Sequence, residues 1–318
     1  MMKQVDEEEK RSMQATDPIR SPELESACPG KAPMLDAAQM MRYLETVQEL
    51  PTLSSVAMRV NSMLLSMDTT ARDLAQVIEK DQSMVSKLLK LANSSFFGFR
   101  SRVSNVAHAI MILGFNAVLN AILSMAVIDA FGVRKYKRNG LDLPAFWRHA
   151  VGVAVVARYL SHSCEGKRNE NAFTAGILHD IGKVVMAIYF TDRSIALRQS
   201  MEYAGISFLE AERRQFPLGH ASLGVFLARR WNLPEDLAAV IAQHHHPGGV
   251  PSMNNLIELV HTADALVNVH LEKNGSQEAW PICKAAWNLM GDKIRTVDQW
   301  LPEVEKEIGA ACESILGD

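Results

Sequence analysis

Cysteine is scarce in this chain. The 318 residues include four cysteines, which lie far apart and form no Cys-x-x-Cys pair: Cys28, Cys164, Cys283 and Cys312. The sequence therefore favours neither a disulfide framework nor a zinc site built on thiolates. An excess of one charge is also missing, because the formal net charge is -3. Whole-chain electrostatics thus gives no reason to expect a nucleic acid or an anionic membrane as a partner.

Long uninterrupted apolar runs are missing as well. The longest apolar stretch, residues 118–133, is broken by Asn120, Ser124 and Asp129 and is too short and too polar to span a bilayer. The N-terminal segment MMKQVDEEEK is acidic and lacks the apolar core of a signal peptide. We therefore expect a cytoplasmic protein that does not contact a membrane.

Strand-like alternation is absent, whereas helical periodicity runs through nearly the whole chain from Met34 onward. The sequence predicts an all-α fold, a helical bundle in two parts. Residues 1–33 are charged and without period, which is typical of a disordered arm. We expect one helical part over residues 34–140, a second over 141–272, and C-terminal helices over 273–318 that pack on the body. Helices of the second part should start near Pro144, Asn171, Ser222, Glu235 and Asn254.

The most informative segment is Gly176-Ile-Leu-His-Asp-Ile-Gly-Lys183. At helical spacing, Asp180 falls on one stripe with apolar residues, namely Phe173, Ile177, Val184 and Ile188. A buried carboxylate is unfavourable unless it is protonated, paired or bound to a metal. The adjacent His179 and further histidines downstream favour the metal.

Other ionisable residues lie on, or next to, apolar stripes of separate helices. They are His149, His220, His244 with its neighbour His245, and Asp264. A single such histidine is more often a hydrogen-bonded core residue than a ligand. Several on different helices indicate a shared centre, because helical bundles build metal sites from inward-facing side chains of different helices. Imidazole and carboxylate without thiolate suit Fe, Mn, Zn, Ni or Co better than a Ca or Mg cage, and such a metal could serve phosphoester hydrolysis.

A series of short motifs runs through the chain from about residue 50 to residue 269. In chain order they are Leu50-Pro-Thr-Leu53, Ala92-Asn-Ser-Ser95, Leu113-Gly114, Phe146-Trp-Arg-His149, Gly176-Ile-Leu-His-Asp-Ile-Gly182, Gly219-His-Ala-Ser-Leu-Gly224, Trp231-Asn-Leu-Pro234, His244-His-His-Pro247 and Ala263-Asp264. Together they resemble the HDOD family, the HD-related output domains of bacterial signalling proteins. One departure is Ser54, where the family usually has a second proline, and it affects a helix start.

The resemblance implies a metal site with two half-sites. Its first ion would be held by the residues that match the HD superfamily ligands, His149, His179, Asp180 and Asp264. Asp180 would bridge to a second ion held by His220, His244 and His245, as in binuclear relatives of the HD-GYP type. We expect divalent ions, up to two, with Fe or Mn preferred over Zn or Mg.

The remaining candidates concern catalysis. Lys183 matches a lysine that the binuclear enzymes place near the phosphate, and with Asp180 it is a candidate catalytic residue; a solvated helix lysine is an equal alternative. The other histidines match no ligand position: His108, His162, His246, His261 and His270. HD-GYP phosphodiesterases carry Asp-Gly-x-Gly-Tyr-Pro after the histidine pair, whereas this chain reads Pro247-Gly-Gly-Val-Pro251. Hydrolysis of cyclic di-GMP is therefore not implied.

Three functions are compatible with the sequence. The favoured one is a bacterial HDOD signalling or regulatory protein that binds a signalling protein partner or a nucleotide and carries an HD-type metal site. The second is a metal-dependent phosphohydrolase acting on a nucleotide or cyclic dinucleotide. The third is a DNA-binding regulator, because residues 70–90 resemble a helix-turn-helix with Ser83, Ser86, Lys87 and Lys90 on the second helix. A plain helical hairpin is the stronger interpretation of that segment, so a nucleic acid is not expected as a partner.

Overall fold

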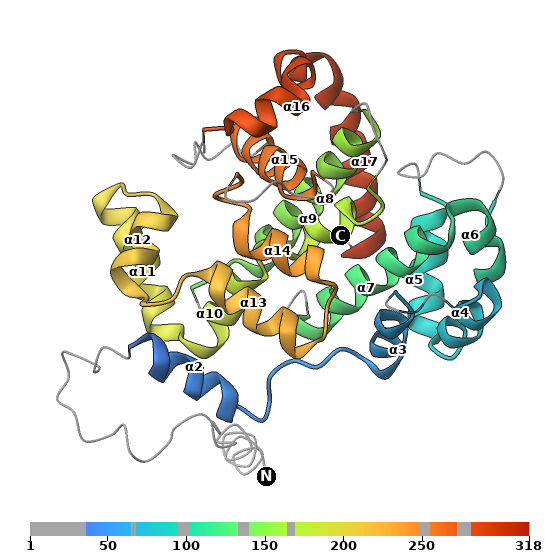
Figure 1. The fold of residues 1–318 in the computed structure, drawn as a ribbon, viewed down its shortest axis with the longest axis horizontal. Helices are drawn as coiled ribbons and strands as arrows, with labels where there is room; N and C mark the ends of the chain where they lie inside the picture. The colour runs from blue at the N-terminus through green and yellow to red at the C-terminus, as the bar shows by residue number, and fades with distance from the viewer. Residues whose placement is uncertain are drawn as a thin grey trace, which may run out of the picture.

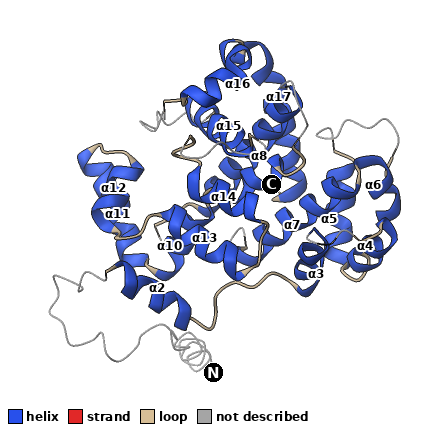
Figure 2. Ribbon diagram, viewed as in Figure 1, coloured by secondary structure: helices blue, strands red, loops and turns tan. Residues whose placement is uncertain are grey.

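The computed structural model describes residues 36–64, 66, 68–94, 102–132, 140–163, 169–248, 255–271 and 281–317. Within these ranges all regular structure is helical (Figure 2), which confirms the predicted all-α class. The first helices are α2 (Ala37–Thr46), α3 (Ser55–Leu64), α4 (Ala71–Ile78), α5 (Gln82–Ala92), α6 (Val106–Leu113), α7 (Phe115–Phe131) and α8 (Leu143–Ser163). The others are α9 (Ala172–Leu178), α10 (Ile181–Tyr189), α11 (Thr191–Ala204), α12 (Phe208–Gln215), α13 (His220–Arg230), α14 (Glu235–Gln243), α15 (Leu256–His270), α16 (Lys284–Arg295) and α17 (Val297–Ile315).

Local sequence explains several of the helix starts. Thr70 and Asp73 form a capping box at α4, in which the Thr70 hydroxyl accepts from the Asp73 amide and the Asp73 carboxylate accepts from the Thr70 amide. The Asp81 carboxylate accepts from the amide of Met84 at 3.0 Å and caps α5. The predicted disordered arm, residues 1–33, lies outside the described residues.

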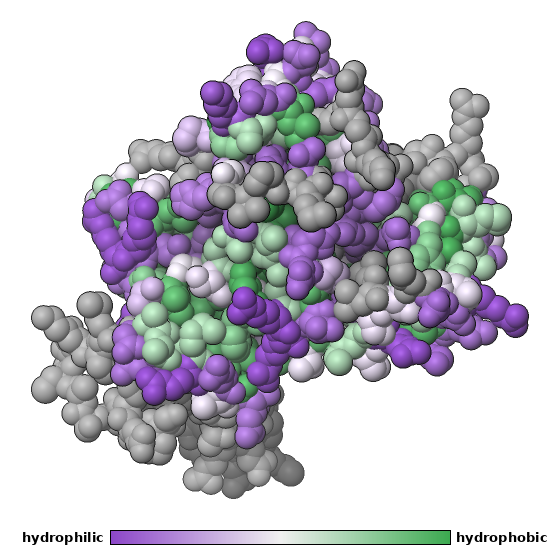
Figure 3. Space-filling view, viewed as in Figure 1, coloured by the Kyte–Doolittle hydropathy of each residue, from purple (hydrophilic) through white to green (hydrophobic). Residues whose placement is uncertain are grey.

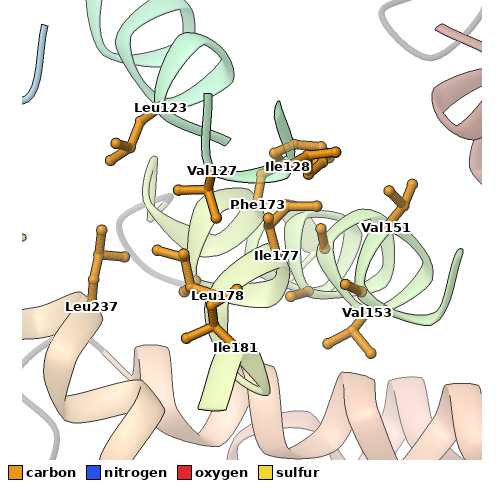
Figure 4. Close-up of a cluster of buried hydrophobic side chains, with 14 of the residues drawn as sticks. Leu123, Val127, Ile128, Val151, Val153, Phe173, Ile177, Leu178, Ile181 and Leu237 are labelled. Atoms are coloured by element: carbon orange, nitrogen blue, oxygen red, sulfur yellow. The ribbon is translucent and has the colours of Figure 1, made fainter. Parts of the chain in front are cut away.

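The buried helix α8 organises the second half of the chain, because α9, α15 and α17 all pack against it (Figure 1). Its contact with α9 is very close: a Cβ on Gly176 would lie 2.4 Å from the Cα of Ala154. Figure 4 shows the apolar side chains that fill the space around this contact, with Val151 and Val153 of α8 near Ile177 of α9. The helices that bear the candidate ligands are therefore held by a dense core.

The long helix α7 connects the two halves, since it packs against α3 and α5 on one side and α9 on the other. Its buried Asn120 accepts a hydrogen bond from the Thr174 hydroxyl of α9 at 3.1 Å and donates to the carbonyl of Glu170 at the same distance. In Figure 1, α3–α6 lie on one side of the central helices and α11–α12 on the other. The proposed division near residue 140 falls between α7 and α8 and stays a prediction.

The C-terminal helix α17 packs along α8 and also contacts α5. Trp300 of α17 stacks on Tyr159 of α8, with ring centroids 4.5 Å apart. At the far end of α17, the Lys90 amine of α5 donates to the carbonyl of Glu313 at 2.6 Å. This helix thus contacts both halves of the protein.

One described stretch, Ala172–Tyr189, is long and apolar enough by composition to cross a membrane, but 83% of its 18 residues is buried inside the protein. Helices α6 and α7 also pass that test as a pair, although they meet at an angle of 117°. Figure 3 shows polar and apolar side chains interspersed over the described part of the visible face. The apolar stretch therefore serves as core.

Candidate metal centre

The seven predicted ligand residues come from helices that are distant in sequence. His149 lies on α8, His179 and Asp180 at the junction of α9 and α10, His220 at the start of α13, His244 and His245 at the end of α14, and Asp264 on α15. His149 and His245 are half-buried, and the other five are buried. The structure brings all of them together in two adjoining groups.

The first group consists of His149, His179 and Asp264, whose ligand atoms all lie within 4.8 Å of one another. The Nε2 atom of His149 is 3.2 Å from Oδ1 of Asp264, and Nε2 of His179 is 3.8 Å from the same oxygen. Asn268, one turn along α15, donates to this Oδ1 atom at 2.8 Å and orients the carboxylate. The geometry offers two imidazoles and a carboxylate to one point.

The second group consists of Asp180, His220, His244 and His245, again with ligand atoms within 4.8 Å of one another. The Nε2 atom of His220 lies 3.3 Å from Nε2 of His244 and 3.0 Å from Nε2 of His245. Three imidazole nitrogens thus converge beside one carboxylate.

Asp180 faces both groups with different oxygens. Its Oδ1 atom lies 3.2 Å from Nε2 of His220 and 3.4 Å from Nε2 of His244. Its Oδ2 atom lies 3.3 Å from Nε2 of His179 and accepts from the Lys183 amine at 2.5 Å. This carboxylate can therefore be shared by two cations, as the sequence resemblance implies.

The helical stripe on which Asp180 was recognised is not continuous. Helix α9 ends at Leu178 and α10 begins at Ile181, and Asp180 has φ -103° and ψ 9°, outside the helical range. The helical spacing that places Asp180 on an apolar stripe therefore runs across a break between two helices. The break turns the Asp180 side chain to the point where α9, α13 and α14 meet.

The second ring nitrogen of the buried histidines is fixed by an acceptor. The Nδ1 atom of His179 donates to the carbonyl of Gly176 at 2.7 Å, and that of His244 lies 3.1 Å from the carbonyl of Ile241. The Nδ1 atom of His220 donates to the Glu212 carboxylate at 2.8 Å. Because these partners accept, each proton sits on Nδ1 and Nε2 faces the centre, as in histidine ligands of metals.

Glu212 was missed by the sequence analysis. It lies on α12, is 5% exposed, and accepts from both the backbone amide and the ring of His220. Its segment, Glu210-Ala-Glu-Arg-Arg214, has the composition of a solvated charged helix, and the hairpin α11–α12 that carries it was not among the predicted helices. The sequence feature that comes nearest to indicating Glu212 is Gly219, because a Cβ added at this glycine would lie 2.7 Å from Oε2 of Glu212.

Burial and charge set the pKa values in the centre. Burial raises the pKa of Asp180, but Lys183 and His179 outweigh it and hold that pKa well below its usual range. Burial lowers the pKa of His220, but the carboxylates of Asp180 and Glu212 beside its ring outweigh it and raise the pKa to about 9. Without metal, the centre therefore balances buried carboxylates with a protonated His220.

Burial and neighbouring charges also set the pKa values of Asp264, His244 and His245. Burial raises the pKa of Asp264, but the hydrogen bond and charge of His149 and the charge of His179 outweigh it and hold that pKa below its usual range. Burial lowers the pKa of both His244 and His245, which favours the neutral rings that bind metals.

Two buried atoms test whether the residues fit a metal. Nε2 of His179 and Oδ1 of Asp180 make no hydrogen bond with any described residue, although imidazole and carboxylate atoms surround them. Buried polar atoms without partners are rare and unfavourable. Lone pairs of this kind, in a nitrogen and oxygen donor set, fit a divalent cation. The metal's identity, Fe or Mn by expectation, stays a prediction.

Lys183 and the remaining histidines are also placed. The Lys183 amine, besides its bond to Asp180, lies 4.5 Å from the centroid of the Phe208 ring. Among the other histidines, His162, His246 and His270 are exposed, and none of the five belongs to either group: His108, His162, His246, His261 and His270.

Metal uptake near neutral pH is expected to release about one proton from His220, because a ring with a raised pKa must lose its proton before Nε2 binds a cation. The apparent affinity should therefore fall as the pH falls, by up to about tenfold per pH unit. A Mn²⁺ titration in weakly buffered solution with a pH indicator measures the release. Glu212→Gln removes one of the acids that raise this pKa and should release fewer protons; equal release from both proteins would contradict the assignment.

Comparison with known proteins identifies the family of this chain. The model of the HDOD domain family matches residues 50–247, well over half of the chain. A Treponema pallidum protein of uncharacterised function is 25% identical over 203 residues, which make up 64% of this chain and 39% of that protein. The chain thus matches well under half of the length of this curated relative.

Solved structures share the fold. An HDOD domain protein of unknown function from Geobacter sulfurreducens has a TM-score of 0.72 at 23% identity, covering 87% of this chain and 97% of its own. A Shewanella amazonensis protein, provisionally named a phosphohydrolase, has a TM-score of 0.68 at 22% identity, with 86% and 97% covered. A Marinobacter aquaeolei protein, provisionally named a signal transduction protein, has a TM-score of 0.65 at 22% identity, with 84% and 59% covered. The family model matches residues that include most of the helices of this chain, and the histidines and acids of the motifs gather in one centre. This chain therefore belongs to the HDOD family.

Proposed function

We propose that this HDOD protein is a signalling module that holds two divalent cations in its HD-type centre and binds the phosphate groups of a nucleotide there. Binding, which a partner protein would read, is the proposed output. The observation that carries the proposal is the position of the Asp180 carboxylate between the two groups, with Oδ1 facing His220 and Oδ2 facing His179.

The exposure of the side chains indicates which would hold the cations and which would meet a ligand. The side chains of His179, His220 and His244 are at most 1% exposed, so they would hold cations away from solvent. The side chain of Lys183 is 17% exposed and that of His149 is 9% exposed, so a ligand would reach the centre past one of these two residues. When bound, divalent cations supply Lewis acidity that orients and neutralises phosphate oxygens. The Lys183 amine adds a positive charge beside Asp180.

Phosphoester hydrolysis is the second candidate, and the position of Lys183 favours it. An amine at the shared carboxylate could stabilise charge that develops on a phosphate during its cleavage. One fold neighbour is provisionally named a phosphohydrolase and another a signal transduction protein. Both functions are therefore compatible with the fold.

DNA binding is less well supported. Lys87 on α5 pairs with Asp129 of α7, and Lys90 donates to the Glu313 carbonyl of α17. Both lysines that the helix-turn-helix interpretation places on its second helix are therefore engaged within the chain.

The test begins with protein purified without chelator or metal-affinity tag and reconstituted with Mn²⁺ or Fe²⁺. We expect two ions per chain, binding of a labelled nucleotide or cyclic dinucleotide that EDTA abolishes, and no turnover of bis(p-nitrophenyl) phosphate above that of an Asp180→Asn control. Fewer than one ion per chain would overturn the proposal. Turnover that the folded Asp180→Asn variant lacks would replace it with the hydrolase.

A further inference from the structure

His261 is a buried histidine of α15 that belongs to neither ligand group. Both of its ring nitrogens are bonded to backbone groups. The amide of Cys283 donates to Nε2 at 3.2 Å, and Nδ1 lies 2.7 Å from the carbonyl oxygen of His244. An amide can only donate, so Nε2 accepts, the ring proton sits on Nδ1, and Nδ1 donates to His244.

The carbonyl that His261 holds is at a critical place. Helix α14 ends at Gln243, His244 is its C-cap, and the last carbonyls of a helix have no partner within it. His244 and His245 are both ligands of the second group, and they follow each other at this helix end. A donor on the His244 carbonyl therefore fixes the backbone from which both ligands project.

The same helix also supplies the first group. Asp264 lies three residues after His261 on α15, and its carboxylate faces His149 and His179. Through His261 and Asp264, one rigid helix thus sets the position of the second group relative to the first. The ring of His244 is oriented separately, by carbonyls of its own helix.

The other bond of His261 leads away from the centre. Cys283 is the N-cap of α16, and its Sγ atom accepts from the Ala286 amide at 3.4 Å. The first residue of this helical unit is therefore attached to the ring that holds the His244 carbonyl.

We propose that His261 is a positioning residue that fixes the His244–His245 turn for the second cation and couples occupancy of that site to the docking of α16. The inference rests on the proposed metal centre. Coupling of this kind is reciprocal. A bound cation should therefore stabilise the start of α16, and disorder of α16 should lower the affinity of the second group for its cation.

Two substitutions separate the two bonds of the ring. His261→Asn keeps an N–H donor at the Nδ1 position for the His244 carbonyl but loses the acceptor for Cys283. His261→Gln keeps an acceptor at the Nε2 position for Cys283 but loses the donor for His244. His270→Asn, on the exposed end of α15, is the matched control.

The measurements are Mn²⁺ binding to the full chain, followed by electron paramagnetic resonance, and amide hydrogen exchange of residues 284–295 with and without Mn²⁺. The background substitution His149→Ala isolates the second group. In that background we expect His261→Gln to weaken binding of the second ion by about 10- to 100-fold, the range for lost partners of metal ligands. In the chain that keeps His149, binding of the first ion should be unchanged. His261→Asn keeps the donor for the His244 carbonyl, so it should bind Mn²⁺ more tightly than His261→Gln does but lose the Mn²⁺-dependent slowing of exchange in α16.

The outcomes separate this inference from the metal centre itself. A parent chain that binds two Mn²⁺ ions while His261→Gln binds both with parental affinity would overturn the positioning role. Slowing of α16 exchange by Mn²⁺ in His261→Asn would overturn the coupling. A parent chain that binds no Mn²⁺ would refute the proposed centre, and this inference with it.

Discussion

Asp180→Asn is expected to lose both cations at once. Its carboxylate oxygens face different groups, Oδ2 toward His179 and Oδ1 toward His220 and His244. An amide in that place carries no charge and turns a donor toward one of the two groups. Each ion should bind at least about 100-fold more weakly, because loss of outer partners of metal ligands alone costs about 10- to 100-fold. Metal content after gel filtration measures the result, with circular dichroism to confirm the fold.

Two further substitutions give this prediction its contrast. Asp264→Asn removes a ligand of the first group alone, and His245→Ala removes a ligand of the second group alone. Each should leave about one ion per chain, whereas Asp180→Asn leaves none. Retention of one ion by Asp180→Asn would show that the carboxylate is not shared.

Helical periodicity in the sequence was sufficient to identify individual candidate ligands. Asp180 stands out because a carboxylate on an apolar stripe conflicts with the pattern around it, and His149 and Asp264 stand out for the same reason. The family motifs then supplied their grouping. All of these residues are contributed by helices whose apolar faces make the core, so local pattern and position in the centre agree.

The residues that surround the ligands could not be found in that way. Glu212 lies in a segment that reads as solvated, and its burial follows from the packing of the α11–α12 hairpin over His220. His261 matches no ligand position, and its role depends on two backbone groups 17 and 22 residues away along the chain. The break at Asp180 was likewise hidden, because apolar residues continue at helical spacing on both sides of it. Such features arise from tertiary contact, which the periodicity of one segment does not encode.

Gly182→Ala is expected to have the largest effect on stability. A Cβ at this position of α10 would lie 1.8 Å from the carbonyl oxygen of His220 and 2.8 Å from the amide nitrogen of Gly224, so α10 and α13 would have to separate. Both atoms are backbone and cannot rotate away. Overpacking of a core commonly costs about 1–3 kcal/mol and occasionally more, and backbone atoms on both sides place this site at the upper end. The corresponding fall in Tm is roughly 4–5 °C for a chain of this length.

The matched control for this substitution is Gly309→Ala, which also lies in a helix but has no atom within 4 Å of the added Cβ. Alanine there should stabilise the protein by about 0.5–1 kcal/mol, because it reduces the freedom of the unfolded chain. Calorimetry and Mn²⁺ binding distinguish the two variants. Since His220 is the first residue of α13, Gly182→Ala should also weaken binding of the second cation. Gly309→Ala should leave the binding of both ions unchanged. An unchanged Tm and two bound ions in Gly182→Ala would mean that α10 and α13 do not approach as closely as the centre requires, and the placement of His220 beside Asp180 would fall with that contact.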